Sequence, residues 1–353
     1  MAERPNLVVA MRPDIVDLVL PAPLRDRLAA LATVHPRPVT DFGTGTSGPG
    51  AGGVDSGAAD ARGTTLPADA LAATDILLTG WGCPPLDAAV LARAPRLAAV
   101  IHAAGTVKGH VRPEVWQRGI AVSSAADANA GPVVEFTLAA IWFAARRALG
   151  GAADYHRGLL PAYGDRRGAD GAVVGVIGAS RIGRGVIARL RAATAAYRIL
   201  LADPYVTPEQ AAALGAELVS PDDLCRAADI VTVHAPDLPE THHLLDARRL
   251  ALLRNGAAVV NTARGRLVDT DALTRECASG RLDAYLDVTD PEPLPPGHPL
   301  HSLPNVLLTP HIAGAQGTEV QRLGAYAVAE VERWIRGEPL LGAVRADELA
   351  RIA

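Results

Sequence analysis

Three segments of the sequence carry side chains whose chemical types suit the reduction of a carbonyl group. They contribute Arg264 in Asn-Thr-Ala-Arg-Gly, Glu292 in Asp-Pro-Glu-Pro and His311 in Thr-Pro-His-Ile-Ala-Gly. Arginine can hold a carboxylate with two hydrogen bonds and polarise a neighbouring carbonyl. Histidine can give a proton when hydride reaches carbon, and an adjacent carboxylate fixes its tautomer and raises its pKa. We therefore expect Arg264 to clamp a 2-oxo acid and His311 with Glu292 to act as the acid–base pair.

A glycine-containing turn is predicted between a strand at 172–178 and a helix at 181–194. Gly178 allows a tight turn, Gly183 allows the helix to pack closely on the strand, and the first amides of the helix can hold a pyrophosphate. Ser180 occupies the place of the usual middle glycine, so either its Cβ shifts a cofactor slightly or its hydroxyl donates to a phosphate oxygen. The cofactor contacts expected at this turn are Gly178, Ser180, Arg181, Ile182 and Gly183.

An acidic residue follows the next predicted strand, 197–202. Asp203 stands twenty residues after Gly183, which is the usual distance to the carboxylate that binds the adenosine ribose. This carboxylate repels a 2′-phosphate, and the following Pro204 and Tyr205 supply no compensating cation. The pattern therefore favours NAD over NADP as the cofactor.

These segments must be positioned by a regular framework, and apolar runs alternate with helix-period segments along most of the chain. This alternation predicts an α/β protein with parallel sheets. The remaining strands are expected at 7–11, 75–79, 97–102, 120–123, 230–234, 257–261, 284–287 and 306–309. The main helices are expected near 23–32, 86–94, 113–117, 131–149, 246–253, 269–279 and 319–336.

Composition limits the class of protein. The chain has 353 residues, enough for about two domains, with 49% hydrophobic and 20% charged residues and a net charge of −4. It lacks the basic excess that binding to nucleic acid or an anionic membrane requires. Because the N-terminus lacks a signal-peptide pattern and the apolar window 131–150 contains charges, we expect a cytoplasmic protein without a membrane partner.

Metal and disulfide sites are not indicated by residue spacing. Cys83, Cys225 and Cys277 lie far apart and are interpreted as small apolar core residues. His242 and His243 are interpreted as surface residues, so the metal prediction is none. The segment 43–63 is almost entirely Gly, Ala, Ser, Thr, Asp and Pro, and we expect a mobile loop there.

The motifs around Arg264, Glu292 and His311 resemble those of the D-2-hydroxyacid dehydrogenase family, an NAD-dependent group that includes phosphoglycerate, glycerate and D-lactate dehydrogenases. The resemblance extends over about residues 70 to 345 and is closest over 172 to 316. It implies that Arg264 binds and orients the substrate, that Glu292 assists His311, and that Asp287 holds the nicotinamide side. The further cofactor contacts that it implies are His234, Ala235, Pro236, Thr262, Ala263 and Gly314.

The resemblance also implies an architecture. It predicts two doubly wound domains, with a Rossmann NAD-binding domain at 129–316 inserted into a flavodoxin-like substrate domain formed by 1–128 and 317–353. The expected partner is a small 2-oxo or 2-hydroxy acid. A homodimer is expected to pack through the nucleotide domain, using the apolar helix around 140–143 and the arm that follows it.

Departures from the family pattern concentrate in the substrate domain. A Gly-x-Gly-x-Asp-Asn-x-Asp run is usual there, whereas this chain has Ala-Ala-Gly-Thr-Val-Lys-Gly-His at 103–110. The amides of Ala104 and Gly105 can still bind a carboxylate, and Lys108 is either a surface residue or a contact for a second anionic group. Phe136 stands where the family usually has histidine.

Two other functions remain open from the sequence. One is an NAD(H)-sensing binding protein on the same fold, which has no need of arginine, glutamate and histidine together. The other is a dehydrogenase with an unusual hydride donor, such as formate or phosphite. No additional local feature of the sequence indicates such a donor. Fold alone does not distinguish them.

Overall fold

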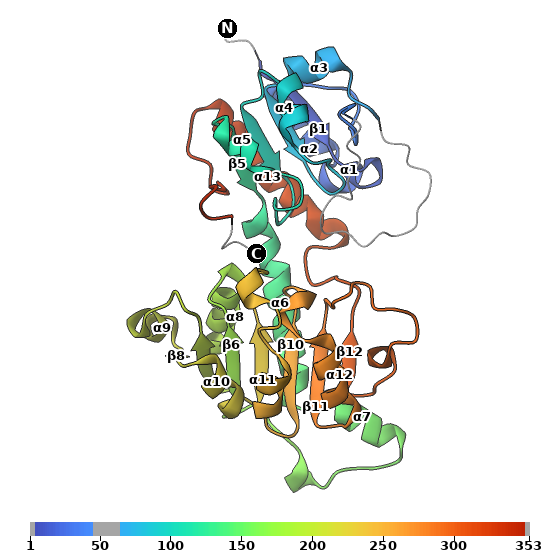
Figure 1. Cartoon of the computed structure of the whole chain (residues 1–353), viewed down its shortest axis with the longest axis vertical. Coiled ribbons are helices and arrows are strands. Elements are labelled where there is room, and N and C mark those ends of the chain that lie inside the picture. The colour runs from blue at the N-terminus through green and yellow to red at the C-terminus, as the bar shows by residue number, and fades with distance from the viewer. Residues whose placement is uncertain (1–3, 45–63, 350–353) are drawn as a thin grey trace. The chain divides into compact units, whose positions relative to one another are not determined.

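The computed structural model describes residues 4–44 and 64–349, which form two compact units. The first unit is built from 1–129 and 315–352, and the second is the continuous stretch 130–314. Figure 1 shows both, each with a parallel sheet between helices. Most of the expected mobile loop, 45–63, lies outside the described residues.

The first unit contains a five-stranded parallel sheet in the order β2-β1-β3-β4-β5. Every neighbouring pair is parallel, and this order is that of the flavodoxin-like doubly wound fold. The strands are β1 (Asn6–Ala10), β2 (Thr33–Val34), β3 (Ile76–Thr79), β4 (Ala99–His102) and β5 (Ala121–Ser124).

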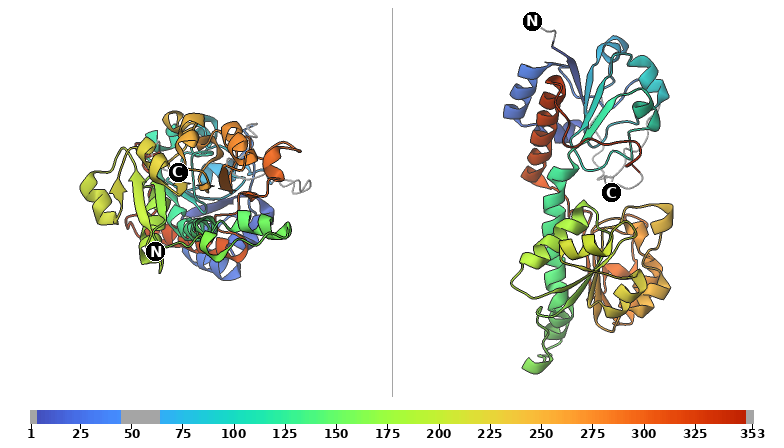
Figure 2. Two further views of the ribbon diagram at one scale, coloured as in Figure 1. Left: turned by 90° about the horizontal axis from the view of Figure 1, so that it is seen from below. Right: turned by 90° about the vertical axis from the view of Figure 1, so that its left-hand side faces the viewer.

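Side chains of this sheet alternate between two helical layers, as the two-residue period of a strand requires. On β1, Leu7 and Val9 pack with one set of helices and Val8 and Ala10 with the other. The first set is α1 (Pro13–Val19), α2 (Ala22–Leu31) and α13 (Val320–Ile335); the second is α3 (Ala68–Ala73), α4 (Ala88–Arg93) and α5 (Pro113–Gln117). Figure 2 shows helices on both faces of the sheet.

The second unit contains a seven-stranded parallel sheet in the order β12-β11-β10-β9-β6-β7-β8. Strands β8-β7-β6-β9-β10-β11 follow the Rossmann strand order, and β12 is one further strand beside β11. The strands are β6 (Val173–Ile177), β7 (Arg198–Ala202), β8 (Glu217–Leu218), β9 (Ile230–Val233), β10 (Ala257–Asn261), β11 (Leu282–Leu286) and β12 (Val306–Leu308). The two doubly wound sheets confirm the predicted fold class.

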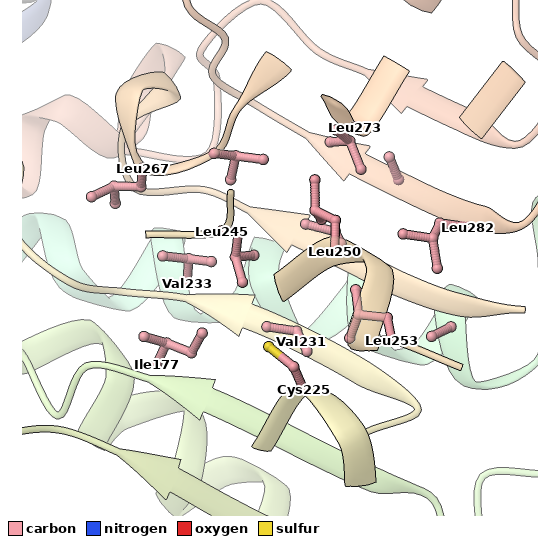
Figure 3. Close-up of a cluster of buried hydrophobic side chains, with 14 of the residues drawn as sticks. Ile177, Cys225, Val231, Val233, Leu245, Leu250, Leu253, Leu267, Leu273 and Leu282 are labelled. Atoms are coloured by element: carbon pink, nitrogen blue, oxygen red, sulfur yellow. The ribbon is translucent and has the colours of Figure 1, made fainter. Parts of the chain in front are cut away.

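Helices cover both faces of this second sheet with apolar side chains. One face packs against α6 (Ala126–Ala145), α8 (Arg181–Ala192) and α9 (Pro208–Leu214). The other packs against α10 (Pro221–Ala227), α11 (Ala247–Leu252) and α12 (Thr270–Ala278), and Figure 3 shows how Cys225, Leu250 and Leu273 from these helices meet the strands.

The predicted helix at 131–149 differs from the structure. Helix α6 starts at Ala126 and ends at Ala145, and a separate helix, α7 (Ala148–His156), follows. Arg147 adopts a left-handed conformation with φ of 49° between them, which interrupts the helical hydrogen bonding. Among the described helices, α6 alone is long and apolar enough to span a membrane, and it packs Ile141 and Ala144 into the core.

Other differences concern short elements. The sequence did not predict α1, α3, α9, β2 or β8, which have seven residues or fewer. Such elements carry too few residues to show a period. Five short 3₁₀ helices complete the described structure: η1 (Tyr163–Asp165), η2 (Pro239–Thr241), η3 (Gly265–Leu267), η4 (Pro299–His301) and η5 (Gly317–Glu319).

Candidate active site

The candidate catalytic residues belong to loops at one edge of the second sheet. All seven strands are parallel, so their carboxyl ends lie along the same edge, where open α/β sheets bind ligands. Arg264 follows β10, Glu292 follows β11 and His311 follows β12. The strand order β12-β11-β10 makes these three loops neighbours.

His311 and Glu292 form a direct pair. Nδ1 of His311 lies 2.6 Å from Oε1 of Glu292, and about one third of each side chain is exposed. This contact directs Nδ1 to the carboxylate and leaves the other ring nitrogen, Nε2, for a different partner. The geometry therefore fits the predicted acid–base pair, with Nε2 as the reactive atom.

Asp287 holds the loop that carries His311. Its buried carboxylate accepts hydrogen bonds from the Thr309 hydroxyl at 2.6 Å and from the amides of Ile312 and Ala313 at 2.8 Å each. Its carbonyl oxygen also accepts from the amide of His311 at 3.0 Å. These bonds hold His311 in a left-handed backbone conformation, with φ of 54°, that a side chain rarely adopts.

The Arg264 loop is shaped by Asn261, the last residue of β10. The Asn261 side chain donates to the carbonyl of Arg264 at 2.8 Å and accepts from the amide of Ala263 at 3.1 Å. Gly265 follows, and a Cβ there would lie 1.9 Å from the carbonyl oxygen of Thr289. Only glycine therefore lets the Arg264 loop pack directly on the loop that carries Glu292.

The electrostatic surroundings of Arg264 are mixed. Burial lowers the pKa of its guanidinium group, while the carboxylates of Asp237 and Glu292 act in the opposite direction. The guanidinium also donates to the carbonyl of Ala263 at 2.6 Å. Arg266 is exposed, and its guanidinium Nη1 lies 3.6 Å from Oδ1 of Asp237. A half-buried guanidinium group is suited to binding a carboxylate in place of water.

The predicted dinucleotide turn has a shape that needs its two glycines. Gly178 has a φ of 97°, and a Cβ there would lie 2.6 Å from the amide nitrogen of Ala235. A Cβ on Gly183 would lie 2.0 Å from the carbonyl oxygen of Gly178. The turn lies between β6 and β9, where the strand order reverses, so the residues present fit a dinucleotide at the switch point of the sheet.

Ser180 and Asp203 both have structural roles at this turn. The Ser180 hydroxyl caps α8 by accepting from the amide of Gly183 at 3.3 Å, and its φ of −63° needs no glycine. The Asp203 carboxylate accepts from the amides of Ala179 at 2.7 Å and Tyr205 at 2.8 Å. The turn and the end of β7 are thereby tied together.

The other expected cofactor residues surround the same sheet edge. His234 is buried, its Nε2 lies 2.8 Å from the Thr232 hydroxyl, and burial lowers its pKa to about 3, so the ring is neutral. The Thr262 hydroxyl lies 2.7 Å from that of Thr137 on α6. The remaining expected contacts follow β9, β10 and β12: Ala235, Pro236, Ala263 and Gly314.

Ala104 and Gly105 belong to the first unit, in the loop after β4. Their amides donate to none of the residues that the structure describes. Near this loop, the ring centroids of the buried His102 and His110 lie 4.4 Å apart, and one nitrogen of each ring lies within hydrogen-bond distance of the Thr79 hydroxyl. Burial lowers the pKa of His110 to about 4 and that of His102 well below its usual value.

The sequence interpretation missed the residues that support the site. Asn261, Gly265 and Thr309 stand within or directly beside the predicted motifs, but their residue types alone do not predict their supporting roles. Asp237 was not considered, although it follows the His-Ala-Pro segment and influences Arg264. An Asx-type turn at Asn261 was the one signal available from sequence.

Comparisons with known proteins identify the family that this chain resembles. Residues 138–313 match the model of the D-isomer specific 2-hydroxyacid dehydrogenase NAD binding domain. The chain is 37% identical over 265 residues to a D-3-phosphoglycerate dehydrogenase of Mycobacterium leprae, covering 74% of this chain and 49% of that protein. The chain thus spans about half the length of that relative. It is 33% identical over 267 residues to a glyoxylate reductase of Thermofilum pendens, covering 72% and 76% respectively.

Solved structures extend the similarity to both units. A phosphoglycerate oxidoreductase from Rhizobium etli superposes with a TM-score of 0.76 at 25% identity, and the match covers 97% of this chain and 98% of that one. The similarity therefore includes the first unit, which the matched NAD binding domain does not reach.

Proposed function

Because the chain belongs to the D-isomer specific 2-hydroxyacid dehydrogenase family and contains its NAD binding domain, we propose that it interconverts a 2-oxo acid and a D-2-hydroxy acid with NAD(H). The observation that carries this proposal is the pairing of His311 with Glu292 at 2.6 Å, on a loop next to that of Arg264. A protein that only sensed NAD(H) has no need of this set of side chains.

The chain's own residues divide the work of the reaction. Arg264 binds the substrate carboxylate through its guanidinium group and orients the adjacent carbonyl. His311 donates a proton from Nε2 to the carbonyl oxygen, and Glu292 stabilises the imidazolium form through Nδ1. Bound NADH supplies the hydride. In the oxidative direction, neutral His311 accepts the hydroxyl proton at the same nitrogen.

Cofactor binding is assigned to the edge of the second sheet around Gly178. The first turn of α8 presents its amide groups to a pyrophosphate. Asp203, at the end of β7, accepts hydrogen bonds from ribose hydroxyls and disfavours a 2′-phosphate, which gives the preference for NAD. Asp287, which already accepts three hydrogen bonds from the His311 loop, is assigned to the nicotinamide side.

The first unit is proposed to bind the rest of the substrate. The amides of Ala104 and Gly105 are available to donate to a carboxylate oxygen of the substrate. Segment 103–110 differs from the usual family sequence, so the identity of the acid is not carried over from a relative. A panel of 2-oxo acids that differ in size and charge is needed to identify the substrate.

A homodimer is proposed through the second unit. The end of α6, together with α7 and the segment after it, exposes large apolar side chains that other parts of the described chain do not cover: Trp142, Phe143, Tyr155, Leu159, Leu160 and Tyr163. Several exposed apolar side chains within one stretch of the chain are typical of a protein interface.

The experiment for the proposed reaction measures NADH oxidation over a panel of 2-oxo acids. The panel contains glyoxylate, pyruvate, hydroxypyruvate, an aromatic and a dicarboxylic member, and each is repeated with NADPH. Selective turnover with NADH supports the proposal and locates the size and charge of the side-chain pocket. Tight NADH binding with no turnover on any member contradicts it and favours an NAD(H)-sensing protein.

A further inference from the structure

His242, His243 and Asp290 come together outside the catalytic set. One nitrogen from each histidine and one oxygen from the aspartate all lie within 4.8 Å of one another. All three residues belong to the second unit, but the aspartate comes from a different loop than the histidines. Spacing in the sequence gave no indication of this cluster.

The fold positions both loops against the η3 segment. The amide of His243 donates to the carbonyl of Arg266 at 2.8 Å, with His243 in a left-handed conformation of φ 50°. On the other side, the Cα of Gly265 packs so closely that a Cβ would lie 2.7 Å from the amide nitrogen of Asp290. His243 is therefore held beside Arg266, and Asp290 is held beside the preceding residue, Gly265.

The side chains of the cluster are available as ligands. The two imidazole rings stack with centroids 3.9 Å apart and an angle of 21° between their planes. Within the described chain, none of the three side chains forms a hydrogen bond or ion pair, although those of His243 and Asp290 are only partly exposed. Three polar groups that lie close together without hydrogen-bonding to one another are well suited to binding a shared cation.

Two imidazole nitrogens and one carboxylate oxygen form the donor set of a borderline divalent metal ion. Zn²⁺ binds such ligands at about 2.0–2.2 Å, and a site with three protein ligands keeps a fourth position for water. Hard cations such as Mg²⁺ prefer oxygen ligands. We propose that His242, His243 and Asp290 form a binding site for a divalent transition-metal ion, with Zn²⁺ as the best fit.

Binding requires a small rearrangement. Donor atoms up to 4.8 Å apart must draw closer to share one ion, so the stacked rings must rotate toward Asp290. His242 is exposed and has room to turn, and the loop at Asp290 also carries Glu292 two residues later. A bound ion therefore tethers the Glu292 loop to the histidine segment, independently of any hydride chemistry.

The test is calorimetric titration of ZnCl₂ into the chelator-treated full chain, with MgCl₂ as the comparison metal. The wild-type protein is expected to show one saturable Zn²⁺ site per chain and no corresponding Mg²⁺ site. Loss of even an indirect partner typically weakens metal affinity by about 10- to 100-fold, so His242→Gln and Asp290→Asn should weaken Zn²⁺ binding at least tenfold. His301→Gln, which changes an exposed histidine on η4, is the matched control.

Folding controls and a third variant separate loss of the metal site from loss of the fold. Circular dichroism and thermal unfolding of each metal-free variant verify that it folds like the wild type, and His243→Asn provides a replacement that tolerates the left-handed backbone. Unchanged Zn²⁺ affinity in folded His242→Gln and Asp290→Asn overturns the site. Absence of a saturable Zn²⁺ site in the wild type overturns it as well.

Discussion

The carboxylate of Asp287 lies beneath the loop that carries His311 and accepts three hydrogen bonds from that loop, while the Asp287 carbonyl accepts the amide of His311 itself. A carboxylate accepts at both oxygens and donates nothing, so it matches a loop that presents a hydroxyl and two amides. His311, the proposed proton donor, is thus positioned by a neighbour at the end of β11 as well as paired with Glu292.

Replacing Asp287 with asparagine is expected to lower kcat by about 10- to 100-fold. The NH₂ group of the new asparagine would face hydrogen-bond donors of the His311 loop. Leaving one such buried donor without an acceptor costs about 1–3 kcal/mol. Steady-state kinetics with the best 2-oxo acid measure the change in kcat. Asp283→Asn, at the opposite end of the same strand, is the control and should keep wild-type kcat. Equal kcat in the two variants contradicts a positioning role for Asp287.

The grouping of the three candidate catalytic residues could be predicted from the sequence because each of them follows a strand. Arg264 and Glu292 follow the buried strands β10 and β11, and His311 follows the partly exposed strand β12, so the carboxyl edge of a parallel sheet defines their neighbourhood. The support from Asn261 and Gly265 was not predictable in detail, because it depends on how two loops pack. The His242, His243 and Asp290 cluster was missed for the same reason.

Asp203→Asn is expected to shift cofactor preference toward NADPH. Asparagine keeps one acceptor oxygen, so it retains only one of the hydrogen bonds from the amides of Ala179 and Tyr205, but it removes the charge that repels a 2′-phosphate. A change of about 1.4 kcal/mol, which is tenfold in the ratio of NADH to NADPH affinity, is a reasonable minimum for two charges at close range. Fluorescence titration with both cofactors measures it. An unchanged ratio would show that Asp203 does not face the ribose.

The buried histidines predict a loss of stability in mild acid. Burial lowers the pKa of His110 to about 4 and that of His102 also falls, whereas the unfolded chain protonates near 6.5. The unfolded state therefore binds more protons, and stability present above pH 6.5 is lost as pH falls toward 4. Between pH 7.5 and 5.5 His110 should lower the free energy of unfolding by about 1.4 kcal/mol, and His102 should add a loss of the same sign.

Urea unfolding followed by tryptophan fluorescence checks this expectation, since Trp81, Trp116 and Trp334 all lie in the first unit. His110→Asn should reduce the acid-dependent loss relative to wild type. The exposed His301 provides the control, because its replacement by glutamine should leave the pH dependence unchanged. A wild-type free energy of unfolding that is equal at both pH values excludes the predicted linkage.

The proposed dimer predicts a measurable mass change. Phe143 and Leu160 expose 56% and 72% of their surfaces, and burying such side chains against a second copy removes apolar surface from water. Wild-type chain should behave as a dimer in light scattering, and the Phe143→Asp/Leu160→Asp double variant as a folded monomer. Replacing Leu341, an exposed apolar residue of the first unit, should not change the mass.

The fold was predictable where the sequence is strongly periodic. Buried strands such as Ala257–Asn261 and the glycine turn at Gly178 identified the doubly wound second sheet. The predicted C-terminal boundary of α6 was wrong because the apolar run in the sequence continues past Arg147, whereas the helix ends at Ala145 and Arg147 has a left-handed backbone. Short elements such as β2 depend on pairing with a neighbouring strand and leave little local signal.

The most direct test of the proposed reaction compares wild type with His311→Gln in the NADH-dependent reduction of the best 2-oxo acid. Glutamine retains a polar side chain but cannot act as an acid, so we expect kcat to fall by about 10²- to 10⁴-fold. NADH affinity should remain within a small factor, because His311 is paired with Glu292 and lies outside the glycine turn. Near-normal kcat in His311→Gln would contradict the assignment of His311 as the proton donor.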